Sequence, residues 1–145
     1  MKQMRMRWFT ALATCLLLSL GCGEDEEDLP ATAPVSGTFT YEGKPVEVGT
    51  VTFYPQGGEG NHGIAIIQAG EEGKFTLTTY KTGDGAVLGS HIVTILYSPF
   101  PEDVMSGKET GKSLPPIYAD PKTSPLKAEI KENKDNEFDF VLEDQ

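Results

Sequence analysis

The chain offers few residue types that support catalysis or metal binding. Its two histidines, His62 and His91, lie far apart in the sequence and form no His-x-x-x-His or Glu-x-x-His pattern, so a zinc pair is not indicated. A Gly-x-Ser-x-Gly nucleophile elbow is also absent from the sequence. We therefore expect His62 at the surface and His91 packed in the fold. The sequence predicts no catalytic residue, no cofactor and no set of metal ligands, which is typical of a protein that is not an enzyme.

Asp84 lies between Gly83 and Gly85 in a predicted loop, where an acidic residue either binds a cation or shapes a turn. A calcium loop of the EF-hand type needs several oxygen ligands at alternate positions, and this loop supplies a single carboxylate. A turn in which Asp84 accepts backbone N–H groups fits the sequence better. A weak cation site shared by Asp84 and Asp120 stays open, because the sequence does not place these two residues relative to each other.

Residues 1–21 have the organisation of a secretory signal peptide. Residues 1–7 carry three basic residues and no acid, thirteen mostly apolar residues follow, and the small residue Gly21 precedes Cys22. The apolar run is shorter than the roughly 20 residues that a helix needs to cross a bilayer. Export with removal of the signal is therefore favoured over a membrane-spanning helix.

Residues 18–22, Leu-Ser-Leu-Gly-Cys, resemble the lipobox of bacterial lipoproteins, with Ser19 where leucine is more usual. The resemblance implies that Cys22 receives a diacylglycerol and becomes the mature N-terminus. Cys15 leaves with the signal, so Cys22 is the only thiol of the mature chain and no disulfide can form. The resemblance also implies sorting to the outer membrane, because Gly23 rather than aspartate follows the cysteine. We expect an exported, lipid-anchored protein whose domain lies in the periplasm or at the cell surface.

Residues 22–34 are predicted to form an acidic, flexible tether. Five consecutive acids occupy residues 24–28, and prolines at 30 and 34 stiffen the remainder. Removal of the basic signal changes the formal net charge from −10 to −13, because no acid precedes Cys22. Such a charge repels nucleic acid and anionic lipid. We therefore expect no nucleic-acid partner and attachment to the membrane through the lipid anchor.

The remainder, residues 35–145, has the pattern of an all-β domain. Short alternating runs rich in Val, Ile, Thr, Phe and Tyr are separated by clusters of Gly, Pro and Asp, and no segment has convincing helical periodicity. The pattern predicts a seven-stranded antiparallel β-sandwich. Its predicted strands are residues 35–41, 50–54, 63–69, 74–79, 90–97, 126–131 and 137–142.

A long proline-rich loop, residues 98–125, interrupts the strand pattern. Loops of this length inside a compact domain are usually functional or disordered. Four of its residues are candidates for contact with a partner, namely Phe100, Ile117, Tyr118 and Asp120. The alternative is that Ile117 and Tyr118 fold back to cover an open end or edge of the sandwich.

Residues 35–53, with Val-Ser-Gly-Thr-Phe, Gly-Lys-Pro-Val and Gly-Thr-Val-Thr-Phe, resemble the start of carboxypeptidase regulatory-like domains. Residues 72–77 and 89–95 are similar to a turn and a closing strand of that family, with His91 where tyrosine is common. Residues 78–86 and 114–126 resemble signatures of small planctomycete lipoproteins. The resemblance implies a transthyretin-like (prealbumin-like) sandwich and no enzyme.

Two classes of function remain at this point. The first is a non-catalytic, lipid-anchored envelope protein that acts as a structural or protein-interaction module, with an envelope protein or polysaccharide as its partner. The second is a carbohydrate- or calcium-binding surface module. The aromatic residues that a sugar site would draw on are Tyr54, Tyr80, Tyr97, Phe100 and Tyr118. The single Trp, at position 8, leaves with the signal, which weakens the case for sugar stacking.

Overall fold

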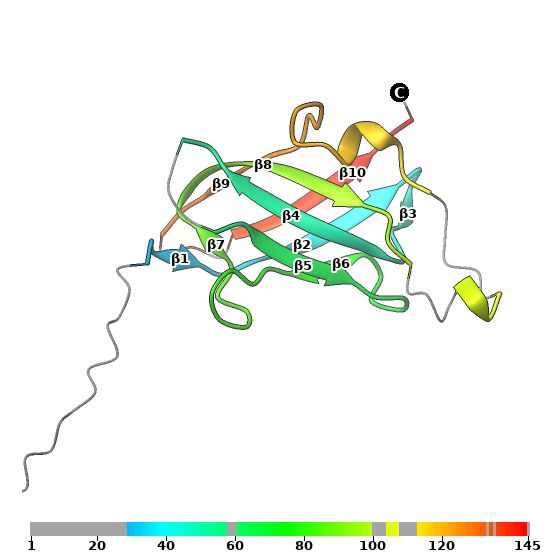
Figure 1. Ribbon diagram of the computed structural model, residues 1–145, viewed down its shortest axis with the longest axis horizontal. Helices are drawn as coiled ribbons and strands as arrows, with labels where there is room; N and C mark the ends of the chain where they lie inside the picture. Colours follow the sequence, from blue (N-terminus) through cyan, green and yellow to red (C-terminus); the bar gives the residue numbers. More distant parts are fainter. Residues whose placement is uncertain are drawn as a thin grey trace, which may run out of the picture.

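The computed structural model describes residues 29–57, 61–99, 104–107, 113–132, 134 and 136–144, and this part of the chain is all-β (Figure 1). The predicted signal peptide, Cys22 and most of the predicted tether lie outside the described residues. The strands are β1 (Thr32–Ala33), β2 (Val35–Tyr41), β3 (Lys44–Pro45), β4 (Gly49–Pro55), β5 (Gly63–Ile67), β6 (Lys74–Thr76), β7 (Ala86–Val87), β8 (Gly89–Leu96), β9 (Lys127–Ile130) and β10 (Asn136–Leu142). A 3-10 turn, η1, covers Pro116–Tyr118.

The strands form two four-stranded sheets that pack face to face, and a two-stranded ribbon. In the first sheet, β2 pairs with β10, β3 and β6; in the second, the order is β5-β4-β8-β9. The ribbon consists of β1 and β7. The predicted all-β class is confirmed, and each of the seven predicted strands has a counterpart in β2, β4, β5, β6, β8, β9 or β10. The other three strands are two residues long, too short for an alternating pattern to indicate them.

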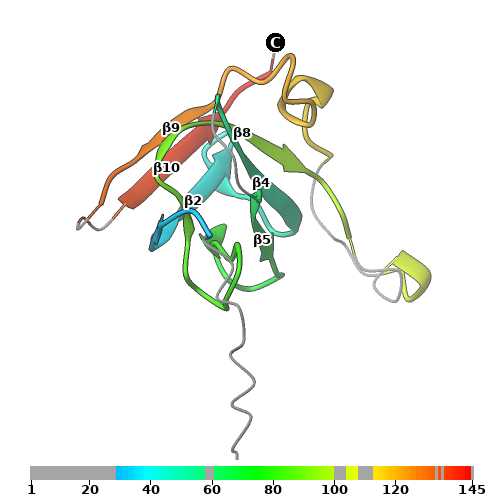
Figure 2. The ribbon, with the colours of Figure 1, turned by 60° about the vertical axis from the view of Figure 1, so that its left-hand side comes forward.

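One strand pair differs from the predicted antiparallel arrangement. The first long strand, β2, and the last, β10, run parallel, with Val35 opposite Asn136 and Tyr41 opposite Leu142. The chain leaves the second sheet after β9 and crosses to the first, so β10 arrives beside β2 in the same direction. The close approach requires a glycine in β2, because a Cβ on Gly37 would lie 1.9 Å from the carbonyl oxygen of Phe138. Adjacent edge strands β9 and β10 therefore belong to different sheets (Figure 2).

The core lies between the two sheets and is centred on phenylalanines. The ring of Phe39 in the first sheet lies 4.8 Å from that of Phe140 and 5.3 Å from that of Phe75. Phe53 of the second sheet completes the group, with its ring 6.1 Å from Phe75 and 6.3 Å from Phe140. These residues follow the predicted alternation, since the residues expected to face inward on these strands are the buried ones.

The third predicted strand differs from its neighbours in its outward face. Its sequence is almost continuously apolar, yet β5 alternates in burial as the other strands do. Ala65 and Ile67 face the core, and the side chains of Ile64 and Ile66 are exposed on the outside of the second sheet. Hydrophobicity alone therefore did not distinguish the two faces of this strand.

The folded part begins earlier than predicted, within the expected tether of residues 22–34. Thr32 and Ala33 form β1 against β7, and the N–H of Leu88 donates to the carbonyl of Ala31. Ala33 is buried, and its carbonyl oxygen would lie 1.8 Å from a Cβ on Gly85, whose φ is +87°. Two small residues thus allow β1 to lie close against the sandwich. Residues 31–33 of the expected tether are therefore paired with the fold.

Two segments lie at opposite ends of the long axis of the molecule. In Figure 1, β1 lies at one end, and a helical turn at residues 104–107 lies beyond the other end. Among the described residues, no helix has the length and apolar character needed to cross a membrane.

Candidate functional site

The second half of the predicted contact loop is part of the fold. Tyr118 is 3% exposed and belongs to the hydrophobic core. Its hydroxyl donates to the carbonyl of Glu143 and accepts from the N–H of the same residue, both at 3.1 Å. Tyr118 therefore attaches the C-terminal segment to η1 and is not a surface anchor for a partner. The alternative, in which this part of the loop folds back onto the sandwich, describes Tyr118 correctly.

Asp120 has a local structural role. Its carboxylate accepts the N–H of Lys122 at 2.8 Å, and its carbonyl accepts the N–H groups of Thr123 and Ser124. The Ser124 hydroxyl in turn donates to the carbonyl of Val93 in β8 at 2.5 Å. These bonds fix the turn after η1 against the second sheet, so Asp120 is occupied in a tight turn.

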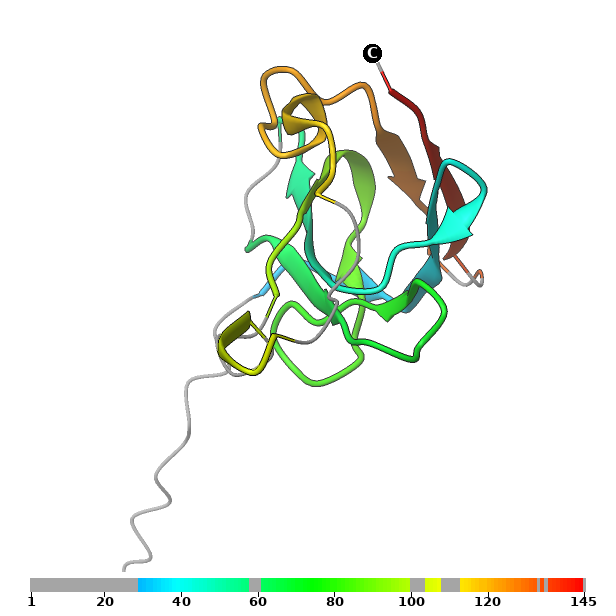
Figure 3. The same cartoon turned by 90° about the vertical axis from the view of Figure 1, so that its right-hand side faces the viewer.

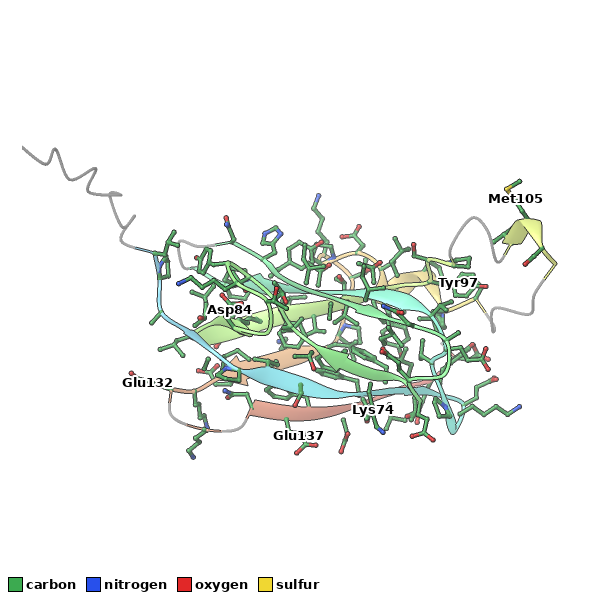
Figure 4. All side chains as sticks on the ribbon, turned by 90° about the horizontal axis from the view of Figure 1, so that it is seen from below. Lys74, Asp84, Tyr97, Met105, Glu132 and Glu137 are labelled. Atoms are coloured by element: carbon green, nitrogen blue, oxygen red, sulfur yellow. The ribbon has the colours of Figure 1, made fainter. Side chains whose placement is uncertain are left out.

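The other two candidate contact residues of the loop, Ile117 and Phe100, have different outcomes. Ile117 is half-buried and packs against the core, and Phe100 lies outside the described residues. The exposed apolar side chains that the structure does describe in this loop are Val104 and Met105, which are 57% and 87% exposed. Met105 lies far from the body of the sandwich (Figure 4). Sequence reasoning missed this pair, although two adjacent apolar residues between acidic and polar stretches were a usable signal.

The Asp84 carboxylate organises the loop between β6 and β7. It accepts the N–H groups of Thr79, Tyr80 and Lys81 at 2.7, 3.0 and 2.9 Å. Partial burial raises the pKa of this carboxyl, but the three N–H donors outweigh burial and hold the pKa below its ordinary value of 3.8. The carboxylate is thus surrounded by donors, as in the turn that we expected.

The cation site shared by Asp84 and Asp120 is not formed. The loop between β6 and β7 and the turn at η1 lie on opposite sides of the molecule in Figures 1 and 3. Within the described ranges, no group of three or more His, Cys, Asp or Glu side chains is close enough to hold a metal ion.

The two histidines occupy different environments, as the sequence predicts. His62 is exposed, and its ring lies 4.4 Å from that of Tyr54. His91 in β8 is 1% exposed and faces the core, with its ring 6.0 Å from that of Phe53. Burial lowers the pKa of His91, while the Gly89 carbonyl and the charge of Glu129 partly oppose that effect.

Comparison with protein-family models, curated proteins and solved structures found no match to this chain.

Proposed function

We propose that this protein is a non-catalytic, lipid-anchored component of the bacterial envelope that presents a β-sandwich for contact with another envelope molecule. Residues 1–21 direct export, and Cys22 carries the lipid. The acidic residues that follow hold the domain away from the anionic membrane surface. The domain itself works in the periplasm or at the cell surface, and Gly23 favours the outer membrane.

One observation carries this proposal, namely the position of β1 relative to residues 104–107. A chain tethered through its N-terminus leaves the domain at the β1 end, whereas Val104 and Met105 are exposed at the opposite end (Figures 1 and 4). An anchor at residue 22 therefore points the exposed apolar pair away from the membrane. This is the orientation that an interaction module needs.

The spacer has a definite reach under this proposal. Because the carbonyl of Ala31 already accepts the N–H of Leu88, residues 22–30 connect the anchor to the fold. At about 3.3 Å per residue, this segment spans at most roughly 30 Å. The domain is therefore held near the bilayer, with its far end accessible to molecules of the adjacent envelope layer.

We also propose that the domain is a carboxypeptidase regulatory-like module of the transthyretin-like type, with the seven predicted strands as its framework. The stretches that carry the resemblance coincide with β2, β4, β6 and β8. These strands contribute residues from both sheets to the central group of phenylalanines. Their arrangement supports a binding scaffold, because the sheets hold a rigid core while the loops at each end are free to vary.

The anchor is tested by replacing the cysteines separately in the full-length precursor. With Cys22→Ser, we expect the protein to leave the membrane fraction on washing with high salt, because acyl chains supply the attachment. With Cys15→Ser, which changes only the signal, attachment should persist. Retention of the Cys22→Ser protein in washed membranes would contradict the proposal.

The contact region is tested by site-specific cross-linking from the cell. The mature chain has no thiol besides Cys22, so Met105→Cys introduces a single reactive site at the far end of the domain. Thr82→Cys in the exposed loop between β6 and β7 serves as the matched control at the β1 end. We expect Met105→Cys to give a discrete cross-linked species that Thr82→Cys does not. Equal patterns from the two variants would contradict a contact at residues 104–107.

A further inference from the structure

The two sheets meet along one seam where β9 of the second sheet runs beside β10 of the first (Figure 2). No ladder of hydrogen bonds joins these two strands, although Asn136 connects them at one end. His91 of β8 lies next to the seam, opposite Ala128 of β9. Its ring lies 6.0 Å from that of Phe53, which in turn lies 6.2 Å from the ring of Phe138 in β10. Side-chain packing of this kind therefore closes the seam along its length.

The imidazole of His91 is held in its neutral form. The residue is 1% exposed, and Nδ1 lies 3.0 Å from the carbonyl oxygen of Gly89. A carbonyl can only accept, so Nδ1 carries the proton and Nε2 has a lone pair. The Nε2 atom is buried and has no hydrogen-bond partner among the described residues. A proton taken up there would create a buried charge whose N–H has no acceptor, which is costly.

The charged groups around His91 do not compensate such a charge. Neither β4 nor β8 contains an acidic or basic residue apart from His91 itself. Four charged residues flank the seam with exposed side chains, namely Lys127 and Glu129 in β9 and Glu137 and Asp139 in β10. The nearest carboxylate, that of Glu129, already accepts the hydroxyl of Ser90. Burial therefore outweighs the Gly89 carbonyl and the charge of Glu129, and it keeps the pKa of His91 below the ordinary value of 6.5.

We propose that His91 makes the seam sensitive to acid, because protonation of Nε2 separates β9 from β10 and admits water to the ring. Separation here breaks side-chain contacts but no strand ladder, so it needs less free energy than unfolding of either sheet. Water has a short path, since a cavity of about 510 Å³ lies beside the seam, with Lys127, Glu129 and Phe138 in its lining. The open form exposes Phe53 and Phe138. This proposal does not depend on the membrane anchor or on the contact at residues 104–107.

The pH dependence of unfolding tests the role of His91. The unfolded chain protonates this residue near pH 6.5 and the folded chain only at lower pH, so stability falls as the pH decreases from 6.5 toward the folded pKa. Between pH 7.5 and 5.5, the unfolding constant of the purified protein should rise by up to about tenfold more than that of His91→Phe, which cannot be protonated. The exposed histidine provides the matched control, since His62→Phe should keep the full rise. The same pH dependence in the parent and in His91→Phe would overturn the proposal.

NMR of the parent protein locates the opening and needs no variant to fold. At pH 7.5, the imidazole nitrogens of His91 should show a proton on Nδ1 and none on Nε2. Ala128 and Ala65 are both 6% exposed, and Ala65 lies in β5, at the other edge of the second sheet. On acidification to pH 5.5, the methyl resonance of Ala128 should shift or broaden before that of Ala65. A proton on Nε2 at pH 7.5, or simultaneous changes at the two alanines, would overturn the proposal.

Discussion

At the scale of single residues, polar side chains in this domain form hydrogen bonds that stabilise its loops. Asp84 illustrates this, because an acid between two glycines is also the pattern of a cation ligand. Its carboxylate instead accepts three consecutive backbone N–H groups and closes the loop between β6 and β7. In the same loop, the N–H of Gly83 donates a hydrogen bond to the hydroxyl of Thr78. Hydrogen bonds within the loop therefore hold it in a defined shape.

Replacement of Asp84 by asparagine should show this role in the pH dependence of stability. The folded pKa of Asp84 lies below the ordinary value of 3.8, so its contribution is complete above pH 3.8 and is lost as the pH falls through the folded pKa. At pH 7, Asp84→Asn should lower the free energy of unfolding by about 1–2 kcal/mol, since the amide offers one acceptor oxygen. Urea unfolding of both proteins should show this difference shrinking below pH 3.8. A difference that is independent of pH would contradict the carboxylate's role.

At the scale of strands, alternation is the property that the sequence determines most directly. Residues such as Phe39, Phe53 and Phe140 could be assigned to the core because every second residue of a half-buried strand faces inward. Pairing partners could not be assigned in this way. The parallel pair of β2 and β10 joins segments about a hundred residues apart, and β1 depends on the fit of Ala33 against Gly85. Both features arise from tertiary contacts that have no local signature.

The parallel pairing of β2 and β10 predicts a large loss of stability on substitution of Gly37. An alanine there would place its Cβ 1.9 Å from the Phe138 carbonyl oxygen and 2.9 Å from the Phe75 ring. We expect Gly37→Ala to lower the free energy of unfolding by about 3 kcal/mol or more, because β10 must move away from β2. Gly43→Ala is the control, since its Cβ would meet nothing within 4 Å and the cost of about 1 kcal/mol comes from the positive φ. Equal costs in chemical denaturation would contradict the close approach.

The crossing between the two sheets depends on one buried amide. The Nδ2 group of Asn136 donates to the carbonyls of Pro34, Lys131 and Lys134, and its Oδ1 accepts the Lys131 N–H at 2.9 Å. Asn136 therefore joins the start of β2, the end of β9 and the start of β10. In the sequence this residue looks like an ordinary turn asparagine, and its contact with Pro34 could not be foreseen.

Asn136→Asp changes this amide with almost no change in shape. The new carboxylate oxygen would face carbonyl oxygens instead of donating to them, so we expect a loss of roughly 3 kcal/mol in unfolding free energy at pH 7. Asn61→Asp, at an exposed position, should change stability by less than about 0.5 kcal/mol. Thermal unfolding of both variants provides the measurement. A tolerated Asn136→Asp would show that the crossing is held by other contacts.

At the scale of the whole molecule, the sequence predicts only part of how the segments are arranged at the two ends of the domain. The sequence predicts an anchor at Cys22 and a proline-rich contact loop, and the fold divides that loop. Tyr118 and Ser124 belong to the body of the sandwich, and the exposed pair Val104–Met105 lies at the end opposite β1. The prediction that Tyr118 contacts a partner was wrong, because its ring lies in the core and its hydroxyl donates to the carbonyl of Glu143. Burial of this kind is decided by the packing of η1, which sequence periodicity does not describe.

The central claim is that Cys22 is the lipid-bearing N-terminus of a tethered domain. Mass spectrometry of the protein purified from washed membranes tests it most directly. The account predicts an N-terminal peptide that begins at Cys22 and carries the added mass of a diacylglycerol, with residues 1–21 absent. Recovery of a chain that retains residues 1–21, or of an unmodified Cys22, would contradict it.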